Sequence, residues 1–181
     1  MAVLPAPPDV LEVFLQPGEL WFGDEKTRIR TVLGSCVAIV LWHPQRRIGG
    51  MCHFMLPSRP RARAGDEPLD GRYGDEAMEL LLRELRRTGT GPADYQAKLF
   101  GGGCMFGPRE GAAAIDVSRR NMEAGRTLLE RAGFRLLSHD LGGEGHRNVI
   151  FDVWSGDVWL RRAQSAPAVA APGRPWERPA S

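Results

Sequence analysis

The order of predicted elements indicates an α/β (α+β) sandwich built around a mixed sheet. Three observations support this class: two hairpin patterns, two amphipathic helical segments, and single strands placed between the helices. The length of 181 residues suits a single domain that buries a core without disulfide bonds. An apolar fraction of 43% with 25% charged residues is normal for such a domain and argues against intrinsic disorder.

The first third of the chain is predicted to be β-structure. Residues 10–15 and 29–33 have the composition of short strands. Residues 36–42 form a nearly unbroken apolar run with β-branched side chains in the middle, which is typical of a strand buried on both faces. The apolar pattern resumes at residues 48–56 after a polar turn, so the two runs predict a β-hairpin.

Apolar side chains at helical spacing predict two helices in the rest of the chain. We expect the first to begin with Asp75 as its N-cap and to end near Gly89. The second is expected to begin with Ser118 as its N-cap and to end at Gly133. Further strands are predicted at residues 96–100 and 134–138, and a second hairpin at residues 149–161.

Composition divides the chain into a folded domain with loose ends. Residues 10–162 carry the periodic patterns and are expected to form the domain. Residues 1–9 are rich in Pro and Ala and are expected to be flexible, and the Pro/Ala/Arg tail at residues 163–181 is expected to be disordered. Residues 58–72 lack periodicity, so we expect a mobile surface loop there.

Charge and hydropathy limit the classes of partner. The net charge of +2, from 24 basic and 22 acidic residues, gives no strong field for nucleic acid or an anionic membrane. No apolar run reaches 18 residues, so membrane insertion is not expected. The first residues lack the basic region of a secretory signal, and we therefore expect a cytoplasmic protein with reduced cysteines.

Cys36 is the candidate nucleophile. It follows Gly34 and Ser35 and opens a buried strand, so it lies at a junction between loop and strand. Backbone N–H groups at such a junction are able to hold an oxyanion. Cysteine is also among the most buried residue types, and spacing alone does not separate a reactive thiol from one that only fills space.

His53 is the candidate partner of Cys36. Both residues lie at the same end of the predicted hairpin, away from its turn, and cross-strand neighbours lie about 5 Å apart. A neighbouring imidazole is expected to lower the pKa of the Cys36 thiol. Cys52 precedes His53 directly, so its side chain is expected to point to the opposite face. A core histidine with one satisfied nitrogen remains the alternative.

The sequence also contains the residue types of two other kinds of site. Cysteine and histidine are present in sufficient number for zinc, but no C-x-x-C occurs and the Cys52-His53 pair points to opposite faces, so no metal site is expected. Gly101, Gly102 and Gly103 follow a predicted strand without the pattern of a phosphate loop. This glycine loop predicts a close approach of backbone to substrate.

Five motifs in chain order resemble the CheD family of bacterial chemotaxis enzymes, the chemoreceptor glutamine deamidases. The match spans roughly residues 10–162. The motifs are Thr31-Val-Leu-Gly-Ser-Cys36-Val-Ala, Gly49-Gly-Met-Cys-His53-Phe-Met-Leu-Pro57, Lys98-Leu-Phe-Gly-Gly-Gly-Cys-Met-Phe106, Arg120-Asn121, and Asp140-Leu-Gly-Gly143 through Gly156-Asp-Val-Trp-Leu-Arg161.

The resemblance implies a cysteine-dependent amidohydrolase that converts receptor glutamines to glutamates. It implies Cys36 as nucleophile, His53 as its partner and Thr31 as the third site residue, within a three-layer α/β/α sandwich. The implied substrates are chemoreceptor cytoplasmic domains, with receptor methyl esters as a second reaction and a CheC-type phosphatase as a binding partner. No metal or organic cofactor is needed for this chemistry.

Other functions remain open at this point. One alternative is a non-catalytic regulatory module that binds a CheC-type phosphatase. A thiol hydrolase acting on a small-molecule amide would use the same residues. A redox sensor based on Cys36 or Cys104 is a further alternative.

Overall fold

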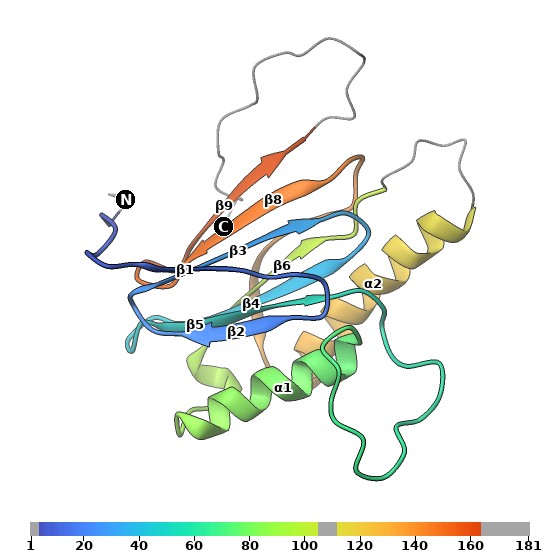
Figure 1. The fold of residues 1–181 in the computed structure, drawn as a ribbon, viewed down its shortest axis with the longest axis horizontal. Helices are drawn as coiled ribbons and strands as arrows, with labels where there is room; N and C mark the ends of the chain where they lie inside the picture. The colour runs from blue at the N-terminus through green and yellow to red at the C-terminus, as the bar shows by residue number, and fades with distance from the viewer. Residues whose placement is uncertain (1–3, 105–111, 164–181) are drawn as a thin grey trace.

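The computed structural model describes residues 4–104 and 112–163, and this part contains two β-sheets and two α-helices (Figure 1). The predicted tail lies almost entirely outside the described residues, and residues 4–9 contain no helix or strand. The strands are β1 (Leu11–Phe14), β2 (Leu20–Gly23), β3 (Thr27–Leu33), β4 (Val37–His43), β5 (Ile48–Phe54), β6 (Gln96–Gly101), β7 (Arg135–Leu141), β8 (Arg147–Asp152) and β9 (Asp157–Arg162). The helices are α1 (Gly74–Arg87) and α2 (Ala112–Arg131), with a 3₁₀ turn at Pro92–Asp94.

Both predicted hairpins are present, and each lies in a different sheet. Sheet A has the strand order β1-β3-β8-β9, and sheet B has the order β2-β5-β4-β6-β7. The β4–β5 and β8–β9 hairpins are antiparallel, whereas the β1–β3 and β6–β7 pairs are parallel. The mixed character predicted from the sequence is therefore confirmed, but it is distributed over two sheets.

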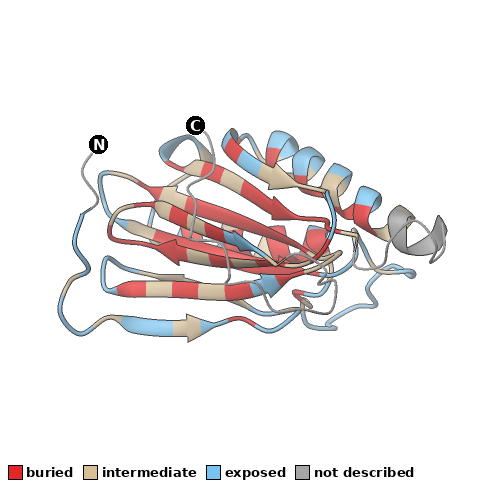
Figure 2. Ribbon diagram, turned by 90° about the horizontal axis from the view of Figure 1, so that it is seen from above, coloured by how far each residue is buried: buried red, intermediate tan, exposed pale blue. Residues whose placement is uncertain are grey.

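The predicted α+β class is confirmed, whereas the expected α/β/α order of layers is wrong. One apolar core lies between sheets A and B, and a second lies between sheet B and both helices. The layers thus run sheet A, sheet B, helices, and buried residues concentrate in sheet B (Figure 2). Alternate residues of β4 pack into the two cores, so sheet B is the middle layer.

The outer face of sheet A needs no helical cover because it is charged. Arg28 and Arg30 project from β3 away from sheet B, and they form ion pairs with Asp152 and Glu12. The β3, β8 and β9 strands of sheet A are antiparallel, and an antiparallel sheet with one polar face is stable against water on that side. Helical periodicity identifies the buried face of each helix but does not tell which side of a sheet it covers.

The two helices begin at different residues from those predicted. α1 begins at Gly74 with Tyr73 as N-cap, so Asp75 lies in the first turn, where its charge suits the helix dipole. α2 begins at Ala112, six residues before the predicted cap Ser118. The intervening alanines favour helix, and the Ser118 hydroxyl donates instead to the carbonyl of Gly103 at 3.2 Å.

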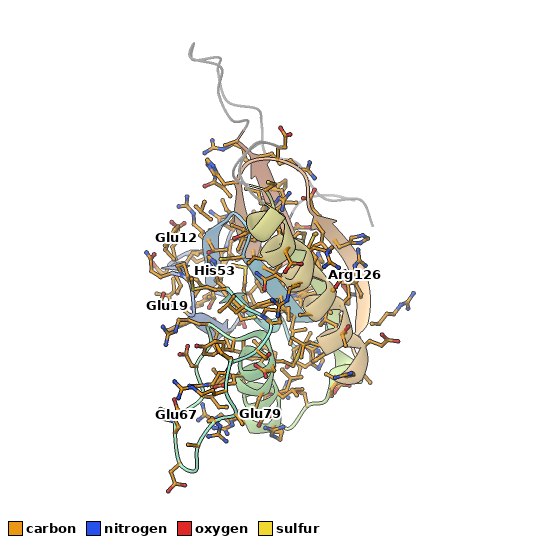
Figure 3. All side chains as sticks on the ribbon, turned by 90° about the vertical axis from the view of Figure 1, so that its right-hand side faces the viewer. Glu12, Glu19, His53, Glu67, Glu79 and Arg126 are labelled. Carbon is orange, nitrogen blue, oxygen red and sulfur yellow. The ribbon has the colours of Figure 1, made fainter. Side chains whose placement is uncertain are left out.

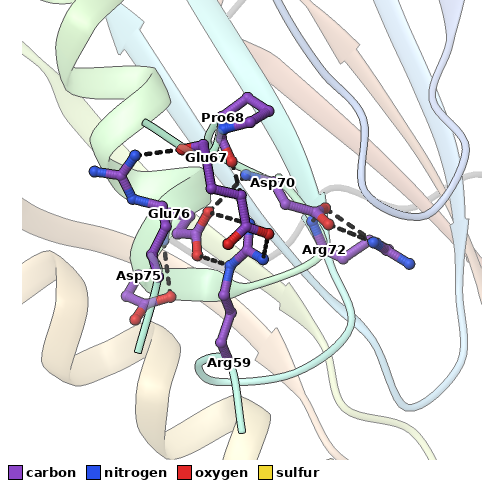
Figure 4. Close-up of polar contacts among 8 residues, drawn as sticks. Arg59, Glu67, Pro68, Asp70, Arg72, Asp75 and Glu76 are labelled. Atoms are coloured by element: carbon purple, nitrogen blue, oxygen red, sulfur yellow. Dashed lines mark hydrogen bonds and ion pairs between the residues drawn. The ribbon is translucent and has the colours of Figure 1, made fainter. Parts of the chain in front are cut away.

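The loop at residues 58–72 is irregular and is tied to α1 by ion pairs. Arg59 contacts both Glu67 in the loop and Glu76 in the first turn of α1 (Figure 4). A hydrogen bond from Arg59 lowers the pKa of Glu76. The backbone N–H of Asp70 also donates to Glu76 at 2.6 Å, so one carboxylate anchors both ends of the loop.

Candidate active site

The β4–β5 hairpin places Cys36 and His53 on the same face of sheet B. His53 pairs with Ala38, and Cys36 precedes Ala38 by two residues, so their side chains share a face. This face packs against sheet A, where Cys36 contacts the apolar core. His53 is 2% exposed, whereas Cys36 is half-buried just before β4. Cys52 faces the helices, as predicted.

Thr31 reaches His53 from the other sheet. It is a buried residue of β3 in sheet A, and its Oγ1 lies 2.8 Å from Nδ1 of His53. The site is therefore assembled across the interface between the sheets. Of the three residues predicted together, the structure joins Thr31 and His53 by a hydrogen bond and adds Cys36 on the same face without a direct hydrogen bond to the ring.

The Thr31 hydroxyl fixes the tautomer of the imidazole. This hydroxyl lies 2.9 Å from the backbone carbonyl of Leu15, which can only accept, so its single hydrogen is donated there. Its oxygen must then accept from His53, and Nδ1 therefore carries the proton. Nε2 is left as an unprotonated base, buried and without a hydrogen-bond partner among the described residues.

Burial keeps both members of the pair neutral. Burial lowers the pKa of His53 to about 4, with the nearby Glu19 carboxylate acting in the opposite direction (Figure 3). Burial likewise raises the pKa of the Cys36 thiol, an effect that its own backbone N–H reduces. The expected lowering of the thiol pKa is thus wrong for this arrangement, because desolvation disfavours each charged form. At neutral pH this face of sheet B therefore carries a neutral thiol and a neutral imidazole.

The glycine loop supports the turn that carries Cys36. The N–H of Gly103 donates to the carbonyl of Gly34 at 2.7 Å, and that of Gly102 donates to the carbonyl of Cys36 at 2.8 Å. A Cβ on Gly101 would collide with the Cys36 carbonyl oxygen, and Gly101 has a φ of 121°. Contact of this loop with substrate remains a prediction.

No backbone carbonyl among the described residues accepts the N–H groups of Ser35 and Cys36. The two carbonyls on the same peptide groups, those of Gly34 and Ser35, are both hydrogen-bonded. These two N–H groups therefore have no backbone acceptor among the described residues, and their role as oxyanion donors stays a prediction.

Sequence reasoning assigned no role to two buried polar residues near this turn. Asn121 on α2 is fully buried and donates through Nδ2 to the carbonyls of Ser35 and Met55. Arg147 is 1% exposed, donates to the carbonyls of Gly101 and Gly142, and lies 3.2 Å from Asp140. The sequence did contain a signal for both residues. Each is polar at a position where the periodicity of its helix or strand predicts a buried apolar side chain.

The described residues contain no cluster of three or more His, Cys, Asp or Glu side chains of the kind that holds a metal ion. Neither described helix is long and apolar enough to cross a bilayer. A cavity of about 550 Å³ opens at the opposite end of the β4–β5 hairpin, beside His43, Tyr95 and Arg135. It borders none of the predicted site residues, so the chemistry of the side chains, not the cavity, defines the candidate site.

Comparison with known proteins finds relatives in one named family. The family model described as CheD chemotactic sensory transduction matches residues 55–162. A protein of Pseudomonas savastanoi pv. phaseolicola, named probable chemoreceptor glutamine deamidase CheD, is 54% identical over 156 residues, which is 86% of each chain. A protein of Chromobacterium violaceum named probable chemoreceptor glutamine deamidase CheD 1 is 51% identical and covers 93% of this chain and 86% of its own.

The chain therefore belongs to the CheD family. The family-model match begins after His53, so it does not test the roles predicted for Cys36, His53 and Thr31, which stay predictions. Among solved structures, the hypothetical protein YfiH of Bacillus licheniformis is similar over 69% of this chain and 49% of its own, with 18% identity and a TM-score of 0.41. A likeness at that level carries no weight for the function.

The lowered pKa of His53 predicts a specific pH dependence of stability. Because the native state binds the His53 proton less tightly than the unfolded state, the free energy of unfolding falls as pH decreases from about 6.5 toward 4. His53→Gln removes this contribution, so its unfolding free energy should fall less over the same range. Urea unfolding of both proteins at pH 7.5 and pH 5 measures the difference. Equal losses in the two proteins would contradict the burial of a neutral His53.

Proposed function

We propose that this protein hydrolyses the side-chain carboxamide of glutamines in chemoreceptors, with Cys36 as nucleophile. The proposal is carried by one observation: the hydrogen-bond chain from Leu15 through Thr31 leaves Nε2 of His53 as a buried base with no partner among residues 4–104 and 112–163, on the face that Cys36 shares. Membership of the CheD family and the names of the relatives supply the substrate class.

The first half-reaction starts from neutral groups. Nε2 of His53 takes the proton of the Cys36 thiol while sulfur attacks the carboxamide carbon, and the C=O electron pair moves onto oxygen. The N–H groups of Ser35 and Cys36 stabilise that oxyanion. When the tetrahedral intermediate collapses, the C–N bond breaks, nitrogen takes the proton from Nε2, and ammonia leaves a thioester on Cys36.

The second half-reaction uses the same residues in reverse. Nε2 takes a proton from water, the resulting hydroxide adds to the thioester carbon, and a second oxyanion forms at the same donors. The C–S bond then breaks and the sulfur recovers its proton from His53, which releases glutamate. A receptor methyl ester would pass through a similar tetrahedral intermediate, release methanol after the same proton transfer from Nε2, and leave the same thioester, so we propose ester hydrolysis as a second reaction.

Thr31 and Glu19 assist His53 in different ways. Thr31 holds the ring in the tautomer that has a free Nε2, as the third member of a catalytic triad does. Glu19 is exposed, and its negative charge favours the protonated ring that exists only during the reaction. Burial therefore keeps the resting base neutral, while Glu19 reduces the cost of its transient charge.

Replacing the nucleophile is the direct test of the function. Cys36→Ala should lower the rate of glutamate formation on a cytoplasmic chemoreceptor fragment by about 10³-fold or more, because no thioester forms. Mass spectrometry of receptor peptides measures the conversion. Cys52→Ala is the matched control, since it removes a buried thiol on the opposite face of the same hairpin and should keep activity. Wild-type turnover by Cys36→Ala would refute the proposed function.

A second substitution tests the role of the hydroxyl. Thr31→Val keeps the shape of the side chain but removes the acceptor for Nδ1–H, so kcat should fall about 10-fold or more. It also leaves the buried Leu15 carbonyl without its donor, at a cost of about 1–3 kcal/mol in stability. Thr31→Ser restores the hydroxyl, so it should recover most of the lost kcat and most of the lost stability. Steady-state kinetics in which the Val and Ser variants were equally active would exclude this role.

A further inference from the structure

The Ser35 carbonyl beside the nucleophile is held by a side chain. The carbonyls of Gly34 and Cys36 accept from backbone N–H groups of the glycine loop. The Ser35 carbonyl between them accepts instead from Nδ2 of Asn121 at 3.1 Å. The orientation of the peptide group joining Ser35 to Cys36 therefore depends on a residue of α2.

Two acceptors define how the Asn121 amide is turned. Its Nδ2 donates to the Ser35 carbonyl and also, at 2.7 Å, to the carbonyl of Met55. Only the NH₂ group can satisfy two carbonyls, so the amide cannot be flipped. One side chain thus bridges the turn before β4, which carries Cys36, and the end of β5, which carries His53.

Because the peptide group is planar, the direction of the Ser35 carbonyl determines the direction of the Cys36 N–H. In a trans peptide the N–H points opposite to the C=O of the preceding residue. The Ser35 carbonyl points toward Asn121 on the helical side of sheet B, so the Cys36 N–H points to the other side. Cys36 packs its side chain on that other side, against the core between the sheets.

We propose that Asn121 is a positioning residue that aims the Cys36 N–H at the oxyanion of the reaction. It acts through the Ser35 carbonyl and does not touch substrate. The proposal rests on the function proposed above, since an oxyanion forms only if Cys36 attacks a carbonyl carbon. The new element is that a residue of the helical layer determines the direction in which the Cys36 N–H points.

A positioning role differs measurably from a purely structural one. Without the Asn121 donor, the peptide between Ser35 and Cys36 is free to rotate, while the hydrogen bonds of Gly102 and Gly103 still hold the turn. Oxyanion stabilisation acts in the transition state, so kcat should fall while KM stays nearly constant. Alkylation of Cys36 by iodoacetamide forms no oxyanion, so its rate should not depend on Asn121.

Two variants of Asn121 and one control variant test the positioning role. Asn121→Leu has a similar size and no donor, and it should lower kcat about 10²-fold with KM and the Cys36 alkylation rate within about threefold of wild type. Asn121→Ala also lacks the donor and provides the same comparison if the leucine variant does not fold. Ser118→Ala is the control, because it removes another hydrogen bond from α2 to the glycine loop without touching the Ser35 carbonyl, and it should retain kcat.

The outcomes separate this proposal from the proposed function. If Cys36→Ala is inactive but a folded Asn121 variant keeps wild-type kcat, the role of Asn121 is overturned and the function stands. If alkylation and deamidation fall together in the Asn121 variants, the residue only maintains the turn, which also overturns the proposal. If Cys36→Ala remains active, the proposed function itself fails.

Discussion

A backbone carbonyl can only accept a hydrogen bond, and in this protein that restriction sets the chemistry of the site. The Leu15 carbonyl takes the hydrogen of the Thr31 hydroxyl, so the hydroxyl must accept from Nδ1 of His53. Nε2 is then left without a proton and without a hydrogen-bond partner in the described part of the chain, on the face that His53 shares with Cys36. The proposed acid–base role of His53 depends on this chain of three groups.

Each layer of the fold contributes one part of the proposed machinery. Sheet A supplies Thr31, sheet B supplies His53, and the turn that leads into β4 supplies Cys36. The helical layer supplies Asn121, whose amide joins the ends of the two strands of the hairpin. Because the groups come from separate layers, the site exists only when both apolar cores are packed. Burial is also what keeps the thiol and the imidazole neutral at rest.

Sequence patterns predicted the local elements better than their assembly. The apolar run at residues 36–42 and its successor at 48–56 predicted the hairpin, and the hairpin placed Cys36 and His53 on one face. The side of sheet B that the helices cover was not predictable. Helical periodicity shows which face of a helix is buried, but it does not show which surface that face packs against. The α2 start was missed because Ser118, a frequent N-cap residue, here serves a tertiary contact. The thiol pKa was misjudged because a sequence gives spacing but not desolvation.

The tautomer of His53 is the most direct measure of the central claim. Heteronuclear NMR of protein labelled with ¹⁵N in histidine, recorded at neutral pH, distinguishes the protonated ring nitrogen from the bare one. The hydrogen-bond chain predicts that the His53 ring is neutral, with its proton on Nδ1 and an unprotonated Nε2. A proton on Nε2, or a ring protonated on both nitrogens at that pH, would contradict the account.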